Sequence, residues 1–301
     1  MHEPVISISN LTRRFGAKTA LNEVTLNVPA GSVFGLVGEN GAGKSTLIKH
    51  ILGLWRAESG KVRVFNLDPV ADPVSVLGRI GYLSEQPDLP DWMRVHEFLR
   101  YTQAFYPKWD ANYVEELRQQ FALDPNARIR VLSKGQRAKL GLLAAQAHRP
   151  DLLLLDEPSS GLDPIVRNDI LTAVIRTVTD EGRTVFFSSH LLEEIERVSD
   201  HIAMLHRGKL VLCGALDDVK AHHRRITLRF DKPRSEAPRV SGTVMVTGAG
   251  RNWTVICNSS VPTRQAIAVD RDAEIVDEGA ASLNEIFIAY AGEPLPATSM
   301  A

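Results

Sequence analysis

A glycine-rich octapeptide, Gly38-Glu39-Asn40-Gly41-Ala42-Gly43-Lys44-Ser45, has the residue types and the spacing of a loop that binds phosphate. Its glycines allow the backbone to curl so that several N–H groups point into one cavity. Lys44 can reach the β- and γ-phosphates of a nucleotide, and the Ser45 hydroxyl can ligate Mg²⁺. We therefore predict that the whole loop and the next residue, Thr46, contact a nucleoside triphosphate.

The elements on either side of the loop fit this prediction. The apolar run Val33–Val37 precedes it and is typical of a buried strand, and the helix-like segment Thr46–Gly53 follows it. A helix that begins at the loop adds the positive end of its dipole to the phosphate site. The alternative is an ordinary glycine turn before a helix, and the match at eight positions in this context argues against it.

A second group of polar residues follows another apolar run, Leu152–Leu155, which is typical of a buried parallel strand. Asp156 and Glu157 come at its carboxyl end, and we expect this strand to lie beside the strand that leads into the glycine-rich loop. Asp156 is then placed to hold Mg²⁺, and Glu157 to polarise a water molecule for attack on the γ-phosphate. The alternative is an acidic turn that ends a strand.

The composition excludes several classes of protein. The 301 residues carry 35 Lys and Arg against 36 Asp and Glu, so the net charge of −1 gives no basic footprint for nucleic acid or an anionic membrane. Cys213 and Cys257 lie far apart, form no metal-ligand pattern and predict reduced thiols. No apolar run approaches the roughly 18 residues that cross a bilayer, and residues 1–10 lack the apolar core of a signal peptide. We expect a cytoplasmic protein whose membrane role, if any, depends on a partner chain.

Strand and helix patterns alternate along most of the chain and predict a mainly parallel, layered α/β domain. The predicted strands are Val5–Ile8, Leu21–Val28, Val33–Val37, Lys61–Phe65, Leu152–Leu155 and Thr184–Phe187. The predicted helices are 91–122, broken near Pro107, Lys134–His148 and Ile165–Thr179.

The composition changes near residue 221, and the rest predicts a small α+β domain over residues 221–292. Short strands are expected at Arg224–Phe230, Thr243–Val246 and Trp253–Cys257, with turns at Pro233–Pro238 and Gly248–Gly250 between them. Ser282–Ala291 is expected to be a closing helix. Residues 293–301 are expected to be a flexible tail. A regulatory role and a role in dimerisation are both open for this domain.

The motif Leu132-Ser133-Lys134-Gly135-Gln136, which precedes Asp156 in the chain, completes a pattern that resembles the ATP-binding cassette (ABC) ATPases over roughly residues 3–220. It is similar to the family signature Leu-Ser-Gly-Gly-Gln, with Lys134 at the first glycine position. Ser133 as an N-cap and Gly135 in the first helical turn offer a hydroxyl, backbone N–H groups and a helix dipole to an anion. In the family that anion is the γ-phosphate of ATP on the opposite protomer, and the resemblance implies contacts from Ser133, Lys134, Gly135 and Gln136.

The resemblance also implies the fold. It predicts a P-loop NTPase domain of the ABC type over residues 1–220, with a RecA-like core, an antiparallel β subdomain and a helical subdomain at about 88–150. The small α+β domain is then a C-terminal appendage to it.

Three shorter motifs agree with the family order. Ser160-Gly161-Leu162-Asp163 resembles the D-loop, which implies that Asp163 lies near the nucleotide across the dimer. His190, after the strand Thr184–Phe187, resembles the switch histidine that bonds the γ-phosphate, so the catalytic residues are predicted to be Glu157, His190 and Lys44. Phe15 lies where the family has an aromatic ring against adenine, although it is equally able to belong to the core.

The chain departs from the family at the Q-loop. The family's glutamine follows a strand similar to Ile80–Leu83, and here the aligned residue is Glu85, with Gln86 as the rival. We predict that these residues contact the nucleotide and that Glu85 also contacts Mg²⁺. A carboxylate there adds negative charge near the phosphates, so hydrolysis is expected to be tuned differently.

The function implied is that of an ATP-binding and ATP-hydrolysing subunit of an ABC transporter. One P-loop and one signature per chain imply that two chains close around two ATP molecules; a homodimer is the simplest assembly, and a heterodimer stays open. Transmembrane permease subunits are expected to contact Glu85–Asp110, where Phe105–Asp110 resembles cassettes of bacterial ABC-2-type exporters, although these aromatics also suit a helical core. The protein would then be cytoplasmic and peripheral on the inner face of the cell membrane.

Two alternatives belong to other classes. A soluble ABC ATPase acting on the ribosome or on nucleic acid is disfavoured by the single cassette, the short spacing between P-loop and signature, and the balanced charge. A non-hydrolysing regulatory cassette is disfavoured by the presence of Glu157 and His190. The transported substrate leaves no trace in this sequence.

Overall fold

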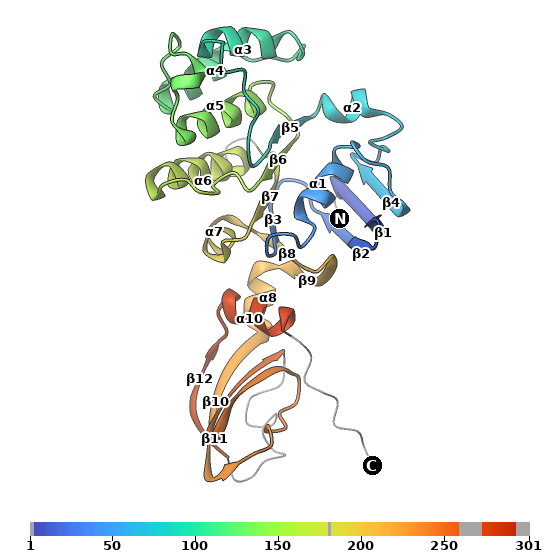
Figure 1. Ribbon diagram of the computed structural model, residues 1–301, viewed down its shortest axis with the longest axis vertical. Coiled ribbons are helices and arrows are strands. Elements are labelled where there is room, and N and C mark those ends of the chain that lie inside the picture. Colours follow the sequence, from blue (N-terminus) through green and yellow to red (C-terminus); the bar gives the residue numbers. More distant parts are fainter. Residues whose placement is uncertain (1–2, 180–181, 259–272, 293–301) are drawn as a thin grey trace. The chain divides into compact units, whose positions relative to one another are not determined.

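The computed structural model describes residues 3–179, 182–258 and 273–292. It divides into two compact units, one up to Cys213 and one from Gly214 (Figure 1). In the described residues no helix has the length and apolar character needed to cross a membrane.

The first unit is built on a six-stranded sheet whose central strands are fully buried. In spatial order its strands are β5 (Ile80–Leu83), β6 (Leu152–Asp156), β7 (Thr184–Ser189), β3 (Val33–Val37), β8 (His201–His206) and β9 (Lys209–Ala215). The four neighbouring pairs from β5 to β8 are parallel. Every residue of β3, β6 and β7 is buried, which explains why these strands are continuous apolar runs rather than alternating ones.

The prediction that β6 lies beside β3, the strand that leads into the glycine-rich loop, is wrong. β6 does not lie beside β3, because β7 is inserted between them: Leu155 pairs with Phe187 on one side of β7, and Gly35 pairs with the same residue on the other. Buried parallel strands have interchangeable apolar sequences, so the local pattern does not encode their order in the sheet. The consequence for the site is that the end of β7 separates Asp156 from the glycine-rich loop.

A second sheet in this unit is antiparallel, with the order β2-β1-β4. Its strands are β1 (Ile6–Phe15), β2 (Lys18–Val28) and β4 (Ser59–Val64). β4 ends one residue before the predicted Phe65, because Phe65 and Asn66 have φ angles of 53° and 64° and turn the chain out of the extended conformation. Side chains of β1 and β2 share one hydrophobic core with helix α1 and strand β3.

Helices cover the parallel sheet and form a separate helical region (Figure 1). They are α1 (Lys44–Ile51), α2 (Pro73–Leu77), α3 (Val95–Gln103), α4 (Ala111–Gln120), the 3₁₀ helix η1 (Ile129–Val131), α5 (Lys134–Gln146), α6 (Pro164–Thr179) and α7 (Leu192–Val198). The predicted helical segment 91–122 consists of α3 and α4, and the residues between them include Pro107. The predicted architecture, an α/β core with an antiparallel β subdomain and helical parts, is confirmed.

The second unit is an antiparallel sheet with helices at its ends in sequence. It contains α8 (Leu216–His222), β10 (His223–Arg234), β11 (Thr243–Asn258), β12 (Ala273–Ala280) and α10 (Leu283–Ala291), with the sheet order β11-β10-β12. Its own core is formed by side chains such as Ile226, Leu228, Trp253 and Val255.

Several details of this unit differ from the prediction. β10 continues to Arg234, past the predicted end at Phe230, and β12 has no counterpart among the predicted strands. The two predicted strands Thr243–Val246 and Trp253–Cys257 both lie within β11. The Asn258 N–H donates to the Gly242 carbonyl at 2.8 Å, so this segment doubles back on itself, and Gly248 and Gly250 have positive φ angles where a turn was expected. The predicted tail, 293–301, lies outside the described residues.

Candidate functional site

A cavity of about 400 Å³ lies against the glycine-rich loop in the first unit. It brings together residues from β1, β2, the loop, α1, the segment after β5 and the end of β6. The lining residues are Phe15, Lys18, Ala20, Asn40, Gly41, Gly43, Lys44, Ser45, Thr46, Glu85 and Glu157.

The glycine-rich loop has a backbone that other residues would not tolerate. Gly41 and Gly43 have φ angles of 81° and 114°, in the region that favours glycine. A Cβ at Gly43 would lie 2.5 Å from the Ala20 carbonyl oxygen, and a Cβ at Gly38 would lie 2.4 Å from that of Leu205. The loop is therefore held tightly between β2 and the end of β8, and α1 begins at Lys44 with its free N–H groups at the cavity.

The ammonium group of Lys44 is buried among oxygen atoms. Its Nζ donates to the carbonyl oxygens of Gly38 at 2.5 Å and Glu39 at 3.2 Å, and it forms an ion pair with Glu157 Oε1 at 2.9 Å. The side chains of Lys44 and Glu157 are each only 6% exposed. Removal of either partner of a buried charge pair leaves the other charge unpaired and strongly destabilises the folded protein. Lys44 and Glu157 therefore hold each other in place.

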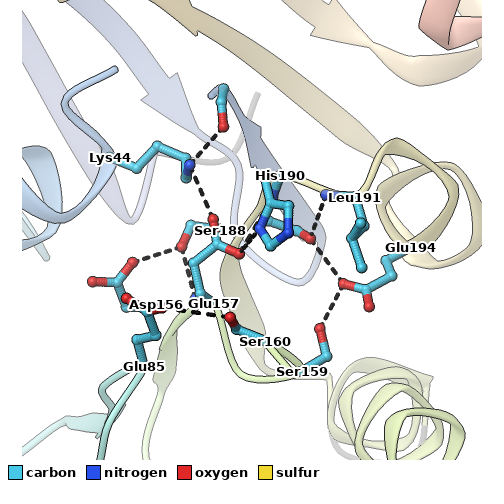
Figure 2. A network of polar contacts seen from close by, with 12 residues as sticks. Lys44, Glu85, Asp156, Glu157, Ser159, Ser160, Ser188, His190, Leu191 and Glu194 are labelled. Atoms are coloured by element: carbon cyan, nitrogen blue, oxygen red, sulfur yellow. Dashed lines mark hydrogen bonds and ion pairs between the residues drawn. The ribbon is translucent and has the colours of Figure 1, made fainter. Parts of the chain in front are cut away.

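Glu157 uses its second carboxylate oxygen to hold His190. Glu157 Oε2 lies 2.6 Å from His190 Nδ1 and accepts the His190 backbone N–H at 3.3 Å (Figure 2). Glu157 has a φ of 50°, which is unfavourable for a residue with a side chain. Such strained positions concentrate at functional sites, and here the conformation directs the carboxylate towards Lys44 and His190.

Asp156 forms a hydrogen bond with β7, the strand that separates it from the glycine-rich loop. The Ser188 hydroxyl, near the end of β7, donates to Asp156 Oδ1 at 2.8 Å and accepts the backbone N–H of Glu157 at 3.0 Å. Burial and then the negative charge of Asp156 raise the pKa of Tyr82 to about 12. Tyr82 therefore stays a neutral phenol across the physiological pH range, and Asp156 faces no second anion from it.

Glu85 and Phe15 both line the cavity. The Ser160 hydroxyl donates to Glu85 Oε1 at 3.4 Å, whereas Gln86 is not among the lining residues. Phe15 is 40% exposed, so it does not belong to the core, and the guanidinium carbon of Arg13 lies 4.8 Å from the centre of its ring. An exposed aromatic face at the cavity is suited to stacking on a base.

The predicted signature and D-loop residues do not line this cavity. Ser133 caps α5, where its hydroxyl accepts the N–H of Gln136 at 3.2 Å and Gln136 Oε1 accepts the N–H of Ser133 at 2.9 Å. A Cβ at Gly135 would lie 2.9 Å from the Val166 side chain, so glycine allows α5 to approach α6 there. Asp163 Oδ1 accepts two backbone N–H groups at the start of α6.

Lys134, the residue that departs from the family signature, extends towards the D-loop. Its Nζ lies 2.5 Å from the position that a Cβ on Gly161 would take. Gly161 has a φ of 64°, a backbone conformation that favours glycine, whereas the flexible end of Lys134 is able to move aside for a side chain.

Sequence reasoning did not find the polar residues that support the site. Ser188, Ser159, Ser189 and Glu194 connect the ends of β6 and β7 to α7. Lys18 and Ala20 line the cavity from β2 and were also missed. The one signal in the sequence was their distance from His190. Ser189 directly precedes His190, and Glu194 follows His190 by one helical turn.

The fold and the site together define a class. A parallel sheet with a glycine-rich loop before a helix, a buried lysine in that loop and two acidic residues at the end of a nearby strand form the nucleotide site of a P-loop ATPase. An antiparallel sheet beside this core and a capped Ser-Lys-Gly-Gln helix distinguish it from other members of that class.

Comparison with known proteins identifies the family. The family model described as ABC transporter matches residues 21–160. The ABC transporter ATP-binding protein YtrB of Bacillus subtilis (strain 168) is 29% identical over 288 residues, which cover 96% of this chain and 98% of YtrB. The bacitracin transport ATP-binding protein BcrA of Enterococcus faecalis is 34% identical over 231 residues, which cover 76% of this chain and 75% of BcrA.

Solved structures agree. A structure described as the ATP binding subunit of an ABC transporter is 29% identical, has a TM-score of 0.67, and matches 72% of this chain and 92% of its own. The dimeric ABC transporter cassette MJ0796 shares the fold, with a TM-score of 0.63 over 70% of this chain and 98% of that one. The chain belongs to the ABC transporter ATP-binding proteins, and as a member of that family it is an ATPase that binds ATP.

Proposed function

We propose that this chain is the ATP-hydrolysing subunit of an ABC-2-type exporter and that it drives separate permease subunits. The carrying observation is the buried contact series Lys44–Glu157–His190 beside a cavity formed by the P-loop. Support for a transporter of this type comes from the similarity to BcrA, whose name records bacitracin transport.

The residues of the site have complementary roles in this proposal. Backbone N–H groups of residues 38–46 and the Lys44 ammonium bind the phosphates, and the Phe15 ring stacks on the base. Glu157 orients and deprotonates the attacking water. His190 holds the Glu157 carboxylate and contacts the γ-phosphate. The group that accepts the proton of water and a group that binds the phosphate charge then lie on the same side of the nucleotide.

The donor set also suits Mg²⁺. Among the described residues no three His, Cys, Asp or Glu side chains form a ready-made metal cluster, which is normal for a cation that binds largely through phosphates and water. Ser45 and Glu85 line the cavity, and Ser188 occupies only one oxygen of Asp156. Ser45, Asp156 and Glu85 would hold the ion, which when bound neutralises charge on the phosphates.

Dimerisation follows from the separation of the two half-sites. The signature and D-loop residues lie outside the cavity of their own chain, as expected if they bind the triphosphate of a second protomer. They are Ser133, Lys134, Gly135, Gln136 and Asp163. The large apolar side chains of Val131 and Ile165, next to the signature and the D-loop, are 69% and 76% exposed. Because one chain carries one P-loop and one signature, the simplest assembly is a homodimer.

The permease is proposed to bind the predicted segment Glu85–Asp110. An apolar groove of about 870 Å³ is lined there by Tyr101, Phe105, Tyr106 and Pro107 on one side and by Val74 and Leu77 on the other. Tyr101 and Phe105 are 55% and 63% exposed, so they contribute a surface rather than a core. The protein would thereby be held at the inner face of the cell membrane.

The proposed domain division keeps nucleotide chemistry in one part of the chain. The ATPase domain is residues 1–220, with a helical subdomain at about 88–150, and the small α+β domain is residues 221–292. All residues that line the cavity lie in the first of these.

The decisive experiment replaces the proposed base. Glu157→Gln keeps the volume of the side chain but loses the charge that pairs with Lys44, exchanges one of the two oxygens for an NH2 group, and cannot accept the proton of water. Steady-state ATP turnover should fall by about 100-fold or more, as for loss of a general base, while ATP binding is retained and a dimer accumulates with ATP. Glu116→Gln, at an exposed position on α4, is the control and should turn over ATP like the wild type.

A Glu157→Gln protein that hydrolyses ATP at the wild-type rate would overturn the assignment of Glu157. A wild-type protein without ATP turnover would overturn the proposed function itself.

A further inference from the structure

A buried carboxylate outside the nucleotide cavity, Glu194 of α7, joins the two segments that carry the proposed catalytic groups. Its side chain is 4% exposed. The hydroxyl of Ser159 donates to Glu194 Oε2 at 2.7 Å, and that of Ser189 donates to the same oxygen at 2.8 Å (Figure 2). Ser159 lies two residues after Glu157, and Ser189 directly precedes His190. Glu194 Oε2 therefore connects the segment that carries Glu157 to the segment that carries His190.

The other oxygen of Glu194 is connected to the D-loop and α6. The Arg167 guanidinium, in the first turns of α6, lies 3.2 Å from Glu194 Oε1. The same guanidinium donates to the carbonyl oxygen of Leu162, in the D-loop, at 3.4 Å. Arg167 thus connects Glu194, through an ion pair, to α6 and to the D-loop.

A purely structural role does not account well for this arrangement. A buried carboxylate carries a desolvation cost, and an apolar side chain of similar volume is often as stabilising at such a position. An apolar side chain, however, cannot accept two hydroxyl hydrogen bonds and form an ion pair, as Glu194 does. The Ser189 hydroxyl also accepts the backbone N–H of Leu191 at 3.0 Å, so its orientation fixes the chain on both sides of His190.

We propose that Glu194 is a positioning residue for ATP hydrolysis: it holds Ser159 and Ser189 in register and transmits movement of α6 and the D-loop to the Glu157–His190 pair. This inference rests on the proposed function, in which Glu157 and His190 act on the γ-phosphate. Glu194 is not among the residues that line the cavity, so its effect on the nucleotide is exerted through these neighbours.

The test compares Glu194→Ala and Glu194→Gln with a matched control, Glu193→Ala, in the full-length protein. Glu193 is the exposed neighbour of Glu194 on the same helix. Glu194→Ala should lower kcat by about 10-fold to 100-fold, since a shift of about 1 Å in the reacting groups has a cost of that order. Its ATP affinity, measured by fluorescent-nucleotide binding, should stay at the wild-type level because the P-loop is untouched.

Glu194→Gln keeps an oxygen for the two serines but loses the charge opposite Arg167, so it should recover part of the lost kcat. Ser189→Ala removes one donor while leaving the ion pair with Arg167, and it should lower kcat without changing ATP affinity. This variant decides the question if Glu194→Ala does not fold.

Two results would overturn the inference. One is a Glu194→Ala protein, or a Ser189→Ala protein if the first is unfolded, with the kcat of Glu193→Ala. The other is a loss of ATP affinity that accounts for the whole loss of activity. In either case an active wild type and an inactive Glu157→Gln protein would leave the proposed function standing.

Discussion

At the scale of single residues, the site depends on side chains that satisfy each other in a buried space. Lys44, Glu157 and His190 form a continuous series of contacts, with donor–acceptor distances of 2.9 Å and 2.6 Å. Polar groups removed from water are stable only when they are paired, so substitutions here affect folding as well as chemistry. An interpretation of any variant therefore needs a stability measurement beside the rate.

Ser188 shows how such a substitution can be tested. Ser188→Ala leaves the Glu157 N–H and one oxygen of Asp156 without the hydroxyl that bonds both. The Glu157 N–H keeps its contact to the Ser188 carbonyl oxygen at 3.2 Å. We expect the free energy of unfolding to fall by about 1–3 kcal/mol, the cost of the buried Asp156 oxygen that loses its donor, and ATP turnover to fall with it. Urea denaturation and steady-state turnover measure the two effects.

The control for this experiment is Ser199→Ala. Ser199 is also buried, but its hydroxyl has no hydrogen-bond partner among the described residues, so its loss should be neutral or slightly stabilising. Equal effects of the two serine substitutions on stability would contradict the role given to Ser188.

At the scale of elements, His148 fastens the end of α5 to β5. The side chain is 2% exposed, its ring is stacked on Tyr106 at 3.9 Å, and its Nε2 lies 3.1 Å from the Ile80 carbonyl oxygen and donates to it. Burial, as the largest effect, lowers the pKa of His148 to about 4. The folded protein therefore keeps this imidazole neutral at pH values where the unfolded chain takes up a proton.

The sign of the pH dependence follows from that difference. Between pH 6.5 and about 4 the unfolded state binds a proton at His148 that the folded state does not, so the free energy of unfolding falls as the pH is lowered. The limit for one group is about 1.4 kcal/mol per pH unit. His148→Phe, which retains the aromatic stack, should lose less stability than the wild type between pH 7.5 and 5.5. Urea denaturation at both pH values tests this, and equal losses would contradict it.

Elements were predictable from the sequence where the signal is local. The glycine-rich loop, the apolar strands Val33–Val37 and Leu152–Leu155, and the Ser133 cap of α5 depend on residues adjacent in the chain. The order of strands was not predictable, because β7 pairs with β3 and β6 through apolar residues that carry no label for their neighbours. The Glu194 contacts were equally hidden, because they join residues 35 and 5 positions apart by geometry alone.

At the scale of the whole molecule, the groove lined by Tyr101 and Phe105 is the surface proposed to bind the permease. Neither residue lines the nucleotide cavity, so Tyr101→Ala with Phe105→Ala should leave ATP turnover of the purified protein unchanged. The double variant should be recovered from membranes with a polytopic partner in clearly lower yield than the wild type, because apolar contact area is lost from the interface.

Val276→Ala is the control, since Val276 is 58% exposed and lies outside the groove. Undiminished recovery of the partner with the double variant would show that the permease binds elsewhere.

The position of β7 in the sheet has a consequence for biosynthesis. The strand that leads into the P-loop, β3, is bonded to β7 on one side and β8 on the other: Val33 pairs with Val185 and Phe34 with His201. A nascent chain therefore emerges from the ribosome with its nucleotide loop complete but with both flanking strands still to be made. Contacts this distant in sequence close slowly and leave apolar strands exposed meanwhile. Stable nucleotide binding has to wait until nearly the whole first unit has been translated.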